Sequence, residues 1–175
     1  MSTSSLPSTL DGWLDHIGRQ HSAEIVMGLE RVREVWQRMG SPRAPINVVV
    51  GGTNGKGSTC AMLEAMLRAA GYKTGFYSSP HISRYNERIC IAGREAADDE
   101  LCASFAAVEA ARTASQPPVP LTYFEFATLS ALQIFVARAV DVAVLEVGLG
   151  GRLDAVNIIA ADVRVVVSVD REHQS

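Results

Sequence analysis

The sequence predicts an α/β fold built on a mainly parallel sheet with flanking helices. Three continuous apolar runs rich in β-branched residues, at 46–50, 142–147 and 163–169, are typical of strands buried on both faces. Segments with apolar residues at helical spacing lie between these runs, and crossovers of that length place successive strands parallel. No internal repeat or low-complexity tract interrupts the alternation.

The individual elements follow in order along the chain. In the segment 58–70, apolar residues at helical spacing predict a helix with one apolar face, made of Met62, Leu63, Met66 and Leu67. The aspartates at 98–99 are expected to cap a helix that runs to about residue 113. Thr122 is expected to cap the next helix, which runs to about residue 139. The other expected elements are a flexible arm at 1–10, an interrupted helical segment at 10–39, a turn at 41–45, strands at 74–78 and 88–92, and a proline-rich break at 116–120.

Composition, charge and cysteine content exclude several classes of protein. Sixteen basic against nineteen acidic residues give a formal net charge of -3, so no general positive field attracts nucleic acid. The charge-free stretch 126–137 has twelve residues, far short of the roughly 20 that span a bilayer. Three widely spaced cysteines match neither a disulfide framework nor a zinc site, and the N-terminus lacks a secretion signal. We therefore expect a reduced, cytoplasmic protein that binds neither nucleic acid nor membrane.

A glycine-rich loop follows the first predicted strand and carries the strongest functional signal. Residues 51–59 read Gly-Gly-Thr-Asn-Gly-Lys-Gly-Ser-Thr. Glycines let backbone N–H groups approach a phosphate closely, and the following helix adds the partial positive charge of its N-terminus. Lys56 would add a cation for the phosphates, and Ser58 or Thr59 a hydroxyl for a metal ion. The strict P-loop pattern is not met, because Gly57 stands where the hydroxyl residue is expected, so a plain glycine turn is the alternative.

An acidic residue, Glu146, ends the apolar strand at 142–147 and is followed closely by glycines. In nucleotide-binding sheets, an acid at the carboxyl edge of the strand beside the P-loop strand faces Mg²⁺. A carboxylate among valines and leucines is costly to bury unless a metal or another partner compensates its charge. The alternative is a strand-end glutamate that is exposed to water.

Several segments together resemble a known family. The loop 52–58 looks like the variant P-loop of the Mur-ligase-like ATP-dependent amide ligases, including the glycine that follows the lysine. Four further segments narrow the resemblance to folylpolyglutamate synthases and, more closely, to the bacterial bifunctional dihydrofolate synthase/folylpolyglutamate synthases. The resemblance implies a P-loop NTPase-like sheet of the Mur ligase central-domain type, incomplete in this chain. The four segments lie at 21–32, 77–82, 121–126 and 145–154.

The resemblance also implies an ATP-dependent ligase reaction. ATP would phosphorylate a substrate carboxylate to an acyl phosphate, and the amino group of L-glutamate would then displace phosphate. The carboxylate would belong to dihydropteroate, to a reduced folate, or to both. Such a reaction depends on positioning and charge neutralisation, with Lys56 and Glu146 as the catalytic residues and ATP and Mg²⁺ as the cofactors. The implied ATP-binding residues are Thr53, Asn54, Gly55, Lys56, Gly57 and Ser58.

Magnesium ligands are implied at three places, Ser79, Glu146 and His173. A serine, a glutamate and a neutral histidine suit Mg²⁺ only as a mixed set completed by water. Arg171 and Glu172 precede the histidine, where the family usually has an apolar residue and then Asp. A surface histidine is the alternative at this position.

Three segments are implied to bind the pteridine or folate. An aromatic wall such as Phe124 suits a planar heterocycle, and a carboxylate such as Asp154 suits its ring N–H groups. Ordinary helix packing is the alternative for Phe124, and Val26 stands where dihydropteroate-binding members are expected to have Asp. The implied contacts are Ile25, Val26, Met27, Thr122, Phe124, Glu125, Arg152, Leu153 and Asp154.

We expect residues 11–175 to be the N-terminal part of the ATP-binding domain of a monomeric ligase whose C-terminal domain is absent from this chain. Two other functions stay open. One is a nucleotide-binding fragment of that ligase without turnover. The other is a small P-loop kinase, which the length fits but which the missing strict P-loop pattern disfavours.

Overall fold

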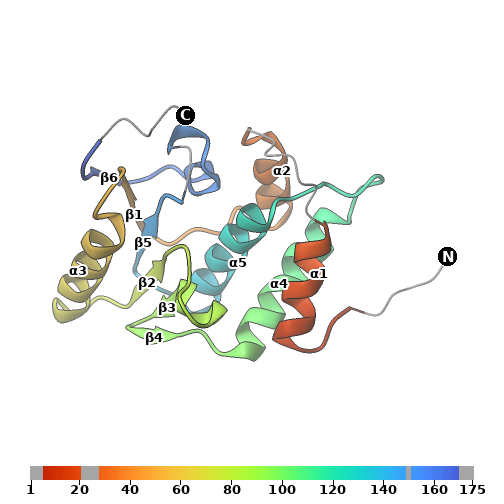
Figure 1. Cartoon of the computed structure of the whole chain (residues 1–175), viewed down its shortest axis with the longest axis horizontal. Helices are drawn as coiled ribbons and strands as arrows, with labels where there is room; N and C mark the ends of the chain where they lie inside the picture. The colour runs from red at the N-terminus through yellow and green to blue at the C-terminus, as the bar shows by residue number, and fades with distance from the viewer. Residues whose placement is uncertain (1–5, 21–27, 149–150, 170–175) are drawn as a thin grey trace.

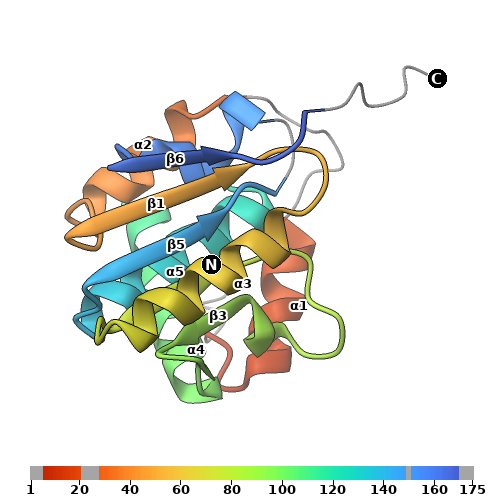
Figure 2. The ribbon, with the colours of Figure 1, turned by 90° about the vertical axis from the view of Figure 1, so that its left-hand side faces the viewer.

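The centre of the molecule is a six-stranded sheet (Figures 1 and 2). The computed structural model describes residues 6–20, 28–148 and 151–169. The strands are β1 (Ile46–Gly51), β2 (Thr74–Tyr77), β3 (Ile89–Ile91), β4 (Arg94–Glu95), β5 (Val142–Glu146) and β6 (Val163–Val166). Their order in the sheet is β4-β3-β2-β5-β1-β6. The last four are mutually parallel and the first two pair antiparallel, which confirms the prediction of a mainly parallel sheet.

Helices cover both faces of the sheet. They are α1 (Leu10–Gln20), α2 (Glu30–Arg38), α3 (Lys56–Ala69), α4 (Asp98–Arg112) and α5 (Tyr123–Ala137), with short 3₁₀ turns at Tyr85–Arg88, Gly151–Leu153 and Ala155–Ile158. Among the described elements, α3 packs on one face, whereas α5 packs on the other with α4 and α1 outside it (Figures 1 and 2). None of the helices described is both long and apolar enough to cross a membrane.

Helix α5 lies in the main hydrophobic core, where Phe126, Leu129 and Phe135 are almost completely buried. Its start is fixed by a reciprocal pair of hydrogen bonds. The Glu125 backbone N–H donates to the Thr122 hydroxyl at 3.2 Å, and the Thr122 backbone N–H donates to the Glu125 carboxylate at 2.8 Å. Such a capping box satisfies donors that a helix start would otherwise leave unpaired. The prediction that Thr122 caps this helix is confirmed.

Helix α4 is capped differently from the prediction. Its N-cap residue is Ala97, whose backbone N–H donates to the Glu100 carboxylate at 3.0 Å. Asp98 is already in the first turn and accepts a hydrogen bond from the Asn86 side chain at 2.8 Å. Asp99 accepts one from the Glu100 N–H at 2.9 Å. The prediction that Asp98 and Asp99 are the cap is wrong, because a glutamate at the third helical position satisfies the N-cap donor instead.

Helix α3 buries only part of its predicted apolar face. Met62 and Met66 are each 66% exposed, so the prediction that they share one apolar face with Leu63 and Leu67 is wrong for the two methionines. Cys60 is fully buried against β1 and β5, and Leu63 and Leu67 pack beside it. These three residues recur at intervals of three and four and form one stripe, from which the methionines are rotated away. Cys60 and the other two cysteines are free.

Strand β6 is exposed, although the apolar run 163–169 predicted burial on both faces. The strand ends at Val166, and Val163 and Val166 are 48% and 67% exposed. The physical reason is its place at the edge of the described sheet, where it pairs with β1 only. A run of valines predicts a strand but does not say what covers its faces.

The close approach of β2 to α5 gives a first test, because a Cβ on Gly75 would lie 2.7 Å from the Phe135 ring. We expect Gly75→Ala to lower the free energy of unfolding by about 1–3 kcal/mol, the usual cost of overpacking a core. Gly18→Ala is the control, since a Cβ on Gly18 of α1 would meet nothing within 4 Å. Alanine should stabilise that helix by about 0.5–1 kcal/mol. Urea unfolding measures both changes, and a neutral Gly75→Ala variant would contradict the tight packing.

Candidate functional site

The glycine loop joins β1 to α3 at the carboxyl edge of the sheet. Gly52 has a φ of 138°, and a Cβ there would lie 2.8 Å from the carbonyl oxygen of Ser168. Gly55 is the N-cap residue of α3 and has a φ of 82°, in the left-handed region that favours glycine. The backbone N–H of Thr53 donates to the same Ser168 oxygen at 2.6 Å. The loop is therefore shaped by its glycines and tied to the segment that follows β6.

Lys56 begins α3, two residues before the predicted start of that helix. Its ammonium group donates hydrogen bonds to the carbonyl oxygens of Gly52, at 2.7 Å, and Thr53, at 3.3 Å. The positive charge thus lies against the loop at a helix N-terminus, where the helix dipole also favours an anion. The arrangement suits a phosphate group. The other predicted ATP-binding residues at this junction are Asn54, Gly55, Gly57 and Ser58.

Glu146 ends β5 directly beside the loop, in register with Val50 of β1, and it is 7% exposed. Its Oε2 accepts a hydrogen bond from the Ser79 backbone N–H at 3.2 Å, and a Cβ on Gly57 would lie 3.6 Å from its Oε1. Burial raises the pKa of the Glu146 carboxyl above its ordinary value, while the Ser79 N–H and the charge of Lys56 lower it by less. An acid in this state is stabilised by any cation that reaches it.

Two of the three predicted metal ligands, Ser79 and Glu146, therefore lie side by side. The third, His173, is outside the described residues. Within the described part of the chain, no three His, Cys, Asp or Glu side chains are grouped so that they could hold a metal ion. The pair that is brought together offers oxygen ligands, which hard cations such as Mg²⁺ prefer.

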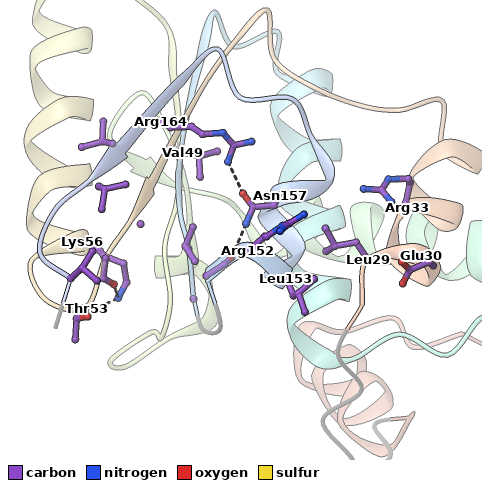
Figure 3. A pocket seen from close by; sticks show the side chains of 18 residues that line it. Leu29, Glu30, Arg33, Val49, Thr53, Lys56, Arg152, Leu153, Asn157 and Arg164 are labelled. Carbon is purple, nitrogen blue, oxygen red and sulfur yellow. Dashed lines mark hydrogen bonds between the residues drawn. The ribbon is translucent and has the colours of Figure 1, made fainter. Parts of the chain in front are cut away.

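A cavity of about 980 Å³ opens beside the loop (Figure 3). In Figure 3, Thr53 and Lys56 lie at one end of the cavity, and Arg152 and Leu153 lie near its middle. Leu29, the N-cap residue of α2, lies on the side opposite the glycine loop. The cavity thus connects the predicted phosphate loop with one of the three predicted substrate segments.

The Glu125 carboxylate is held in an ion pair. Arg31 of α2 donates from Nε to Glu125 Oε2 at 3.0 Å, and its Nη2 lies 2.9 Å from Oε1. The two side chains are 17% and 6% exposed. Because Glu125 also completes the cap with Thr122, one carboxylate fixes α2 against the start of α5. The sequence analysis missed Arg31, since no local pattern links residues 94 positions apart.

Phe124 and Asp154 both contact the turn at Gly148, after β5. A Cβ on Gly148 would lie 2.8 Å from the Phe124 ring, whose centre is 6.0 Å from that of Tyr77. Asp154 is 4% exposed and accepts hydrogen bonds from the backbone N–H groups of Gly148, at 2.9 Å, and Val156, at 3.0 Å. Its carboxylate therefore shapes the turn. The predicted substrate contacts Ile25, Val26 and Met27 lie outside the described residues.

These features define the class of the protein. A mainly parallel sheet, a variant P-loop after β1 and a buried acid on the neighbouring strand together make a Mur-ligase-like α/β fold of the P-loop type. No family model matches the chain.

The chain is homologous to bacterial dihydrofolate synthase/folylpolyglutamate synthases. It is 51% identical to the protein of that name from Escherichia coli K12 over 172 residues, which are 98% of this chain and 40% of the relative. It matches the structure of E. coli FolC in complex with DHPP and ADP with a TM-score of 0.90 and 50% identity, over 98% of this chain and 41% of that one. These matches confirm the resemblance seen in the motifs.

A second solved structure is a bifunctional folylpolyglutamate synthase/dihydrofolate synthase with Mn, AMPPNP and L-glutamate bound. It matches with a TM-score of 0.89 and 47% identity, over 99% of this chain and 41% of that one. The chain thus spans about 40% of the length of the relatives that it matches.

The Arg31–Glu125 pair predicts a large difference between two glutamate substitutions. Glu125→Gln removes one negative charge from a largely buried ion pair with Arg31, so we expect a loss of about 3 kcal/mol in the free energy of unfolding. The control is Glu34→Gln, which removes the ion pair with Arg38 on the surface of α2, where the glutamate is 51% exposed. That change should cost less than about 1 kcal/mol. Equal losses in urea unfolding would show that the Arg31 pair is no more than a surface contact.

The raised pKa of Glu146 predicts a pH-dependent gain in stability on substitution. Because the pKa is higher in the folded state, the folded state favours the protonated Glu146 carboxyl. The stability that this group contributes is therefore present below the unfolded pKa of glutamate and is lost as pH rises through the folded pKa. Glu146→Gln should therefore be more stable than the parent at neutral pH, by less than about 2 kcal/mol. The difference should shrink towards zero on acidification.

Glu87→Gln is the control, because its expected effect on stability at neutral pH has the opposite sign. Hydrogen bonds from the backbone N–H groups of Ile82, Arg84 and Ser83 lower the pKa of the Glu87 carboxyl. Its stabilisation is present above the unfolded pKa and is lost as pH falls through the folded pKa, so Glu87→Gln should destabilise the protein at neutral pH. Thermal melting from pH 4 to 8 compares the two, and a Glu146→Gln variant that is less stable at neutral pH would contradict the assignment.

Proposed function

We propose that this chain supplies the ATP-binding part of a ligase that joins L-glutamate to dihydropteroate, to a reduced folate, or to both. The main observation in support is that Lys56, Ser79 and Glu146 lie close together at the carboxyl ends of β1, β2 and β5. Homologues with ADP, with AMPPNP and Mn, and with L-glutamate support a nucleotide, a divalent ion and glutamate as the reactants.

The phosphate loop would hold the triphosphate of ATP. The start of α3 would face an anion, and the glycines leave room for close approach, whereas the backbone N–H groups of Thr53 and Asn54 donate to Ser168 in this structure. The Lys56 ammonium, which donates to loop carbonyls in this structure, would turn to the transferring phosphoryl group and offset its charge. Thr53, Asn54, Gly55, Gly57 and Ser58 would complete this cradle.

Glu146 and Ser79 fit a Mg²⁺ ion. A buried carboxylate with a raised pKa beside a serine gives the oxygen donors that Mg²⁺ prefers, and water would complete the set. When bound, the ion would neutralise charge on the phosphates. Glu146 and the Ser79 hydroxyl would bind it, and the Ser79 backbone N–H would also fix the orientation of the Glu146 carboxylate. We infer that His173 is a third ligand.

The proposed ligation has two chemical steps, which need only the substrate carboxylate, ATP and L-glutamate. The substrate carboxylate would attack the γ-phosphorus of ATP, which releases ADP and leaves an acyl phosphate. The amino nitrogen of L-glutamate would then attack the acyl carbon and phosphate would leave as the amide forms. Residues 25–27, Thr122, Phe124, Glu125 and 152–154 would orient the pteridine-bearing substrate. Of these, Glu125 and Asp154 act through the positions of α2 and the Gly148 turn.

A second candidate is a nucleotide-binding fragment without turnover, which the 40% coverage of the relatives favours. In this case residues 11–175 would be the N-terminal part of the ATP-binding domain, and a further domain would be needed for ligation. In both cases we propose that the protein is a cytoplasmic monomer. The three free cysteines support the cytoplasmic location.

Phosphate release separates the candidate functions. It is measured in this chain and in a chimera that completes it with the remaining sequence of the E. coli relative, with each substrate omitted in turn. Release that needs ATP, glutamate and a pteridine acid supports the ligase, whereas release without glutamate excludes it. ATP binding without turnover in the chain, combined with an active chimera, supports the fragment. ADP formation that needs only a phosphoryl acceptor supports a kinase.

Lys56→Gln should lower ligation at least about 100-fold in whichever protein turns over, because one charge-stabilising donor is lost. Lys73→Gln is the matched control, since Lys73 directly precedes β2, at the opposite end of the parallel strands from the loop. It should retain activity within about twofold. A Lys56→Gln variant with parent-like turnover would remove Lys56 from the mechanism.

A further inference from the structure

Three arginines around the cavity lack the carboxylate partners that most arginines of this chain have. Of the thirteen arginines in the described residues, eight form ion pairs. Arg33, Arg152 and Arg164 pair with no carboxylate of the described chain, yet all three line the same cavity. They come from α2, from the 3₁₀ turn after β5, and from β6.

Arg152 and Arg164 lie by Asn157, away from the phosphate loop, and Arg33 lies on the opposite, α2 side of the same cavity. Arg164 donates to Asn157 Oδ1 at 2.9 Å, and Asn157 itself donates to the Gly151 carbonyl oxygen at 2.8 Å, which holds this guanidinium in place. Figure 3 shows Arg152 beside Asn157 and Arg33 pointing towards them from the α2 side. Lys56 lies at the other end of the cavity in the same view.

Among the described residues that line the cavity, the cationic side chains outnumber the acidic ones. The only acid among the described lining residues is Glu30, and its Oε2 lies against Gly28, 2.6 Å from where a Cβ would be. Like charges that line one cavity repel one another, so a bound anion would stabilise the arrangement. The planar guanidinium group matches a carboxylate with two parallel hydrogen bonds.

We propose that Arg33, Arg152 and Arg164 form a carboxylate subsite for the glutamyl tail of the pteridine substrate. The inference depends on the proposed ligase function and deepens it. Dihydropteroate has one carboxylate, which must reach the nucleotide to react. A glutamylated folate has further carboxylates that do not react and that need cationic partners outside the phosphate loop. The subsite therefore selects substrates that already carry glutamate.

The test compares two ligands in matched variants. Dissociation constants for 7,8-dihydropteroate, dihydrofolate triglutamate, ATP and L-glutamate are measured calorimetrically in this chain and in the chimera. Arg33→Gln and Arg164→Gln should each weaken the triglutamate about 10-fold, which corresponds to the loss of one charge-assisted hydrogen bond. Binding of dihydropteroate and ATP should change less than about twofold.

Arg94→Gln is the control, since this arginine is exposed on β4, at the opposite edge of the sheet, and also lacks a described carboxylate partner. It should leave all four constants unchanged, and thermal melting verifies that every variant is folded. Triglutamate affinity should fall with added salt in the parent and less steeply in the cavity variants.

Other outcomes overturn the inference in distinguishable ways. Equal weakening of triglutamate and dihydropteroate, or a parent that binds the triglutamate no better than dihydropteroate, excludes a tail subsite. Weakening of ATP or of free glutamate alone assigns the arginines to that ligand instead. A parent that binds ATP but neither pteridine excludes the proposed ligase function itself.

Discussion

The parallel pairing of β5 with β1 is the constraint on which the candidate site depends. Its register places Glu146 opposite Val50, at the point where β1 turns into the glycine loop. A slip of one residue would turn the glutamate to the other face of the sheet, because side chains alternate along a strand. The register is held by the buried valines of both strands. The acid and the phosphate loop are therefore brought together by core packing.

The features fixed by neighbouring residues could be predicted from the sequence. The cap at Thr122 depends on Glu125 three residues later, and the glycine loop depends on its own backbone. The strand-end position of Glu146 follows from an apolar run that stops there. Each signal is local, so it can be read without knowing where other segments lie. The ligand roles of these residues stay predictions.

The features that depend on distant segments could not be predicted. Which side of α3 meets the sheet is decided by β1 and β5, so the apolar spacing of Met62 and Met66 was misleading. The exposure of β6 depends on what lies beside it. The Arg31–Glu125 pair joins two helices far apart in sequence, so Glu125, a predicted substrate contact, also fixes α2 against the start of α5.

Charged side chains at the cavity and at the nearby carboxyl ends of the strands lack the ion-pair partners that most charged side chains have elsewhere in the described part of the molecule. Most described arginines are neutralised by a carboxylate, whereas Lys56 donates to carbonyl oxygens and forms no ion pair within the described residues, and Glu146 is buried with a raised pKa. Uncompensated charges of either sign lower the stability of the empty fold. A ligand that supplies the missing counter-charge binds the folded state only and therefore stabilises it. Because a cation at Glu146 and an anion at Lys56 would lie beside each other, binding of each should favour binding of the other.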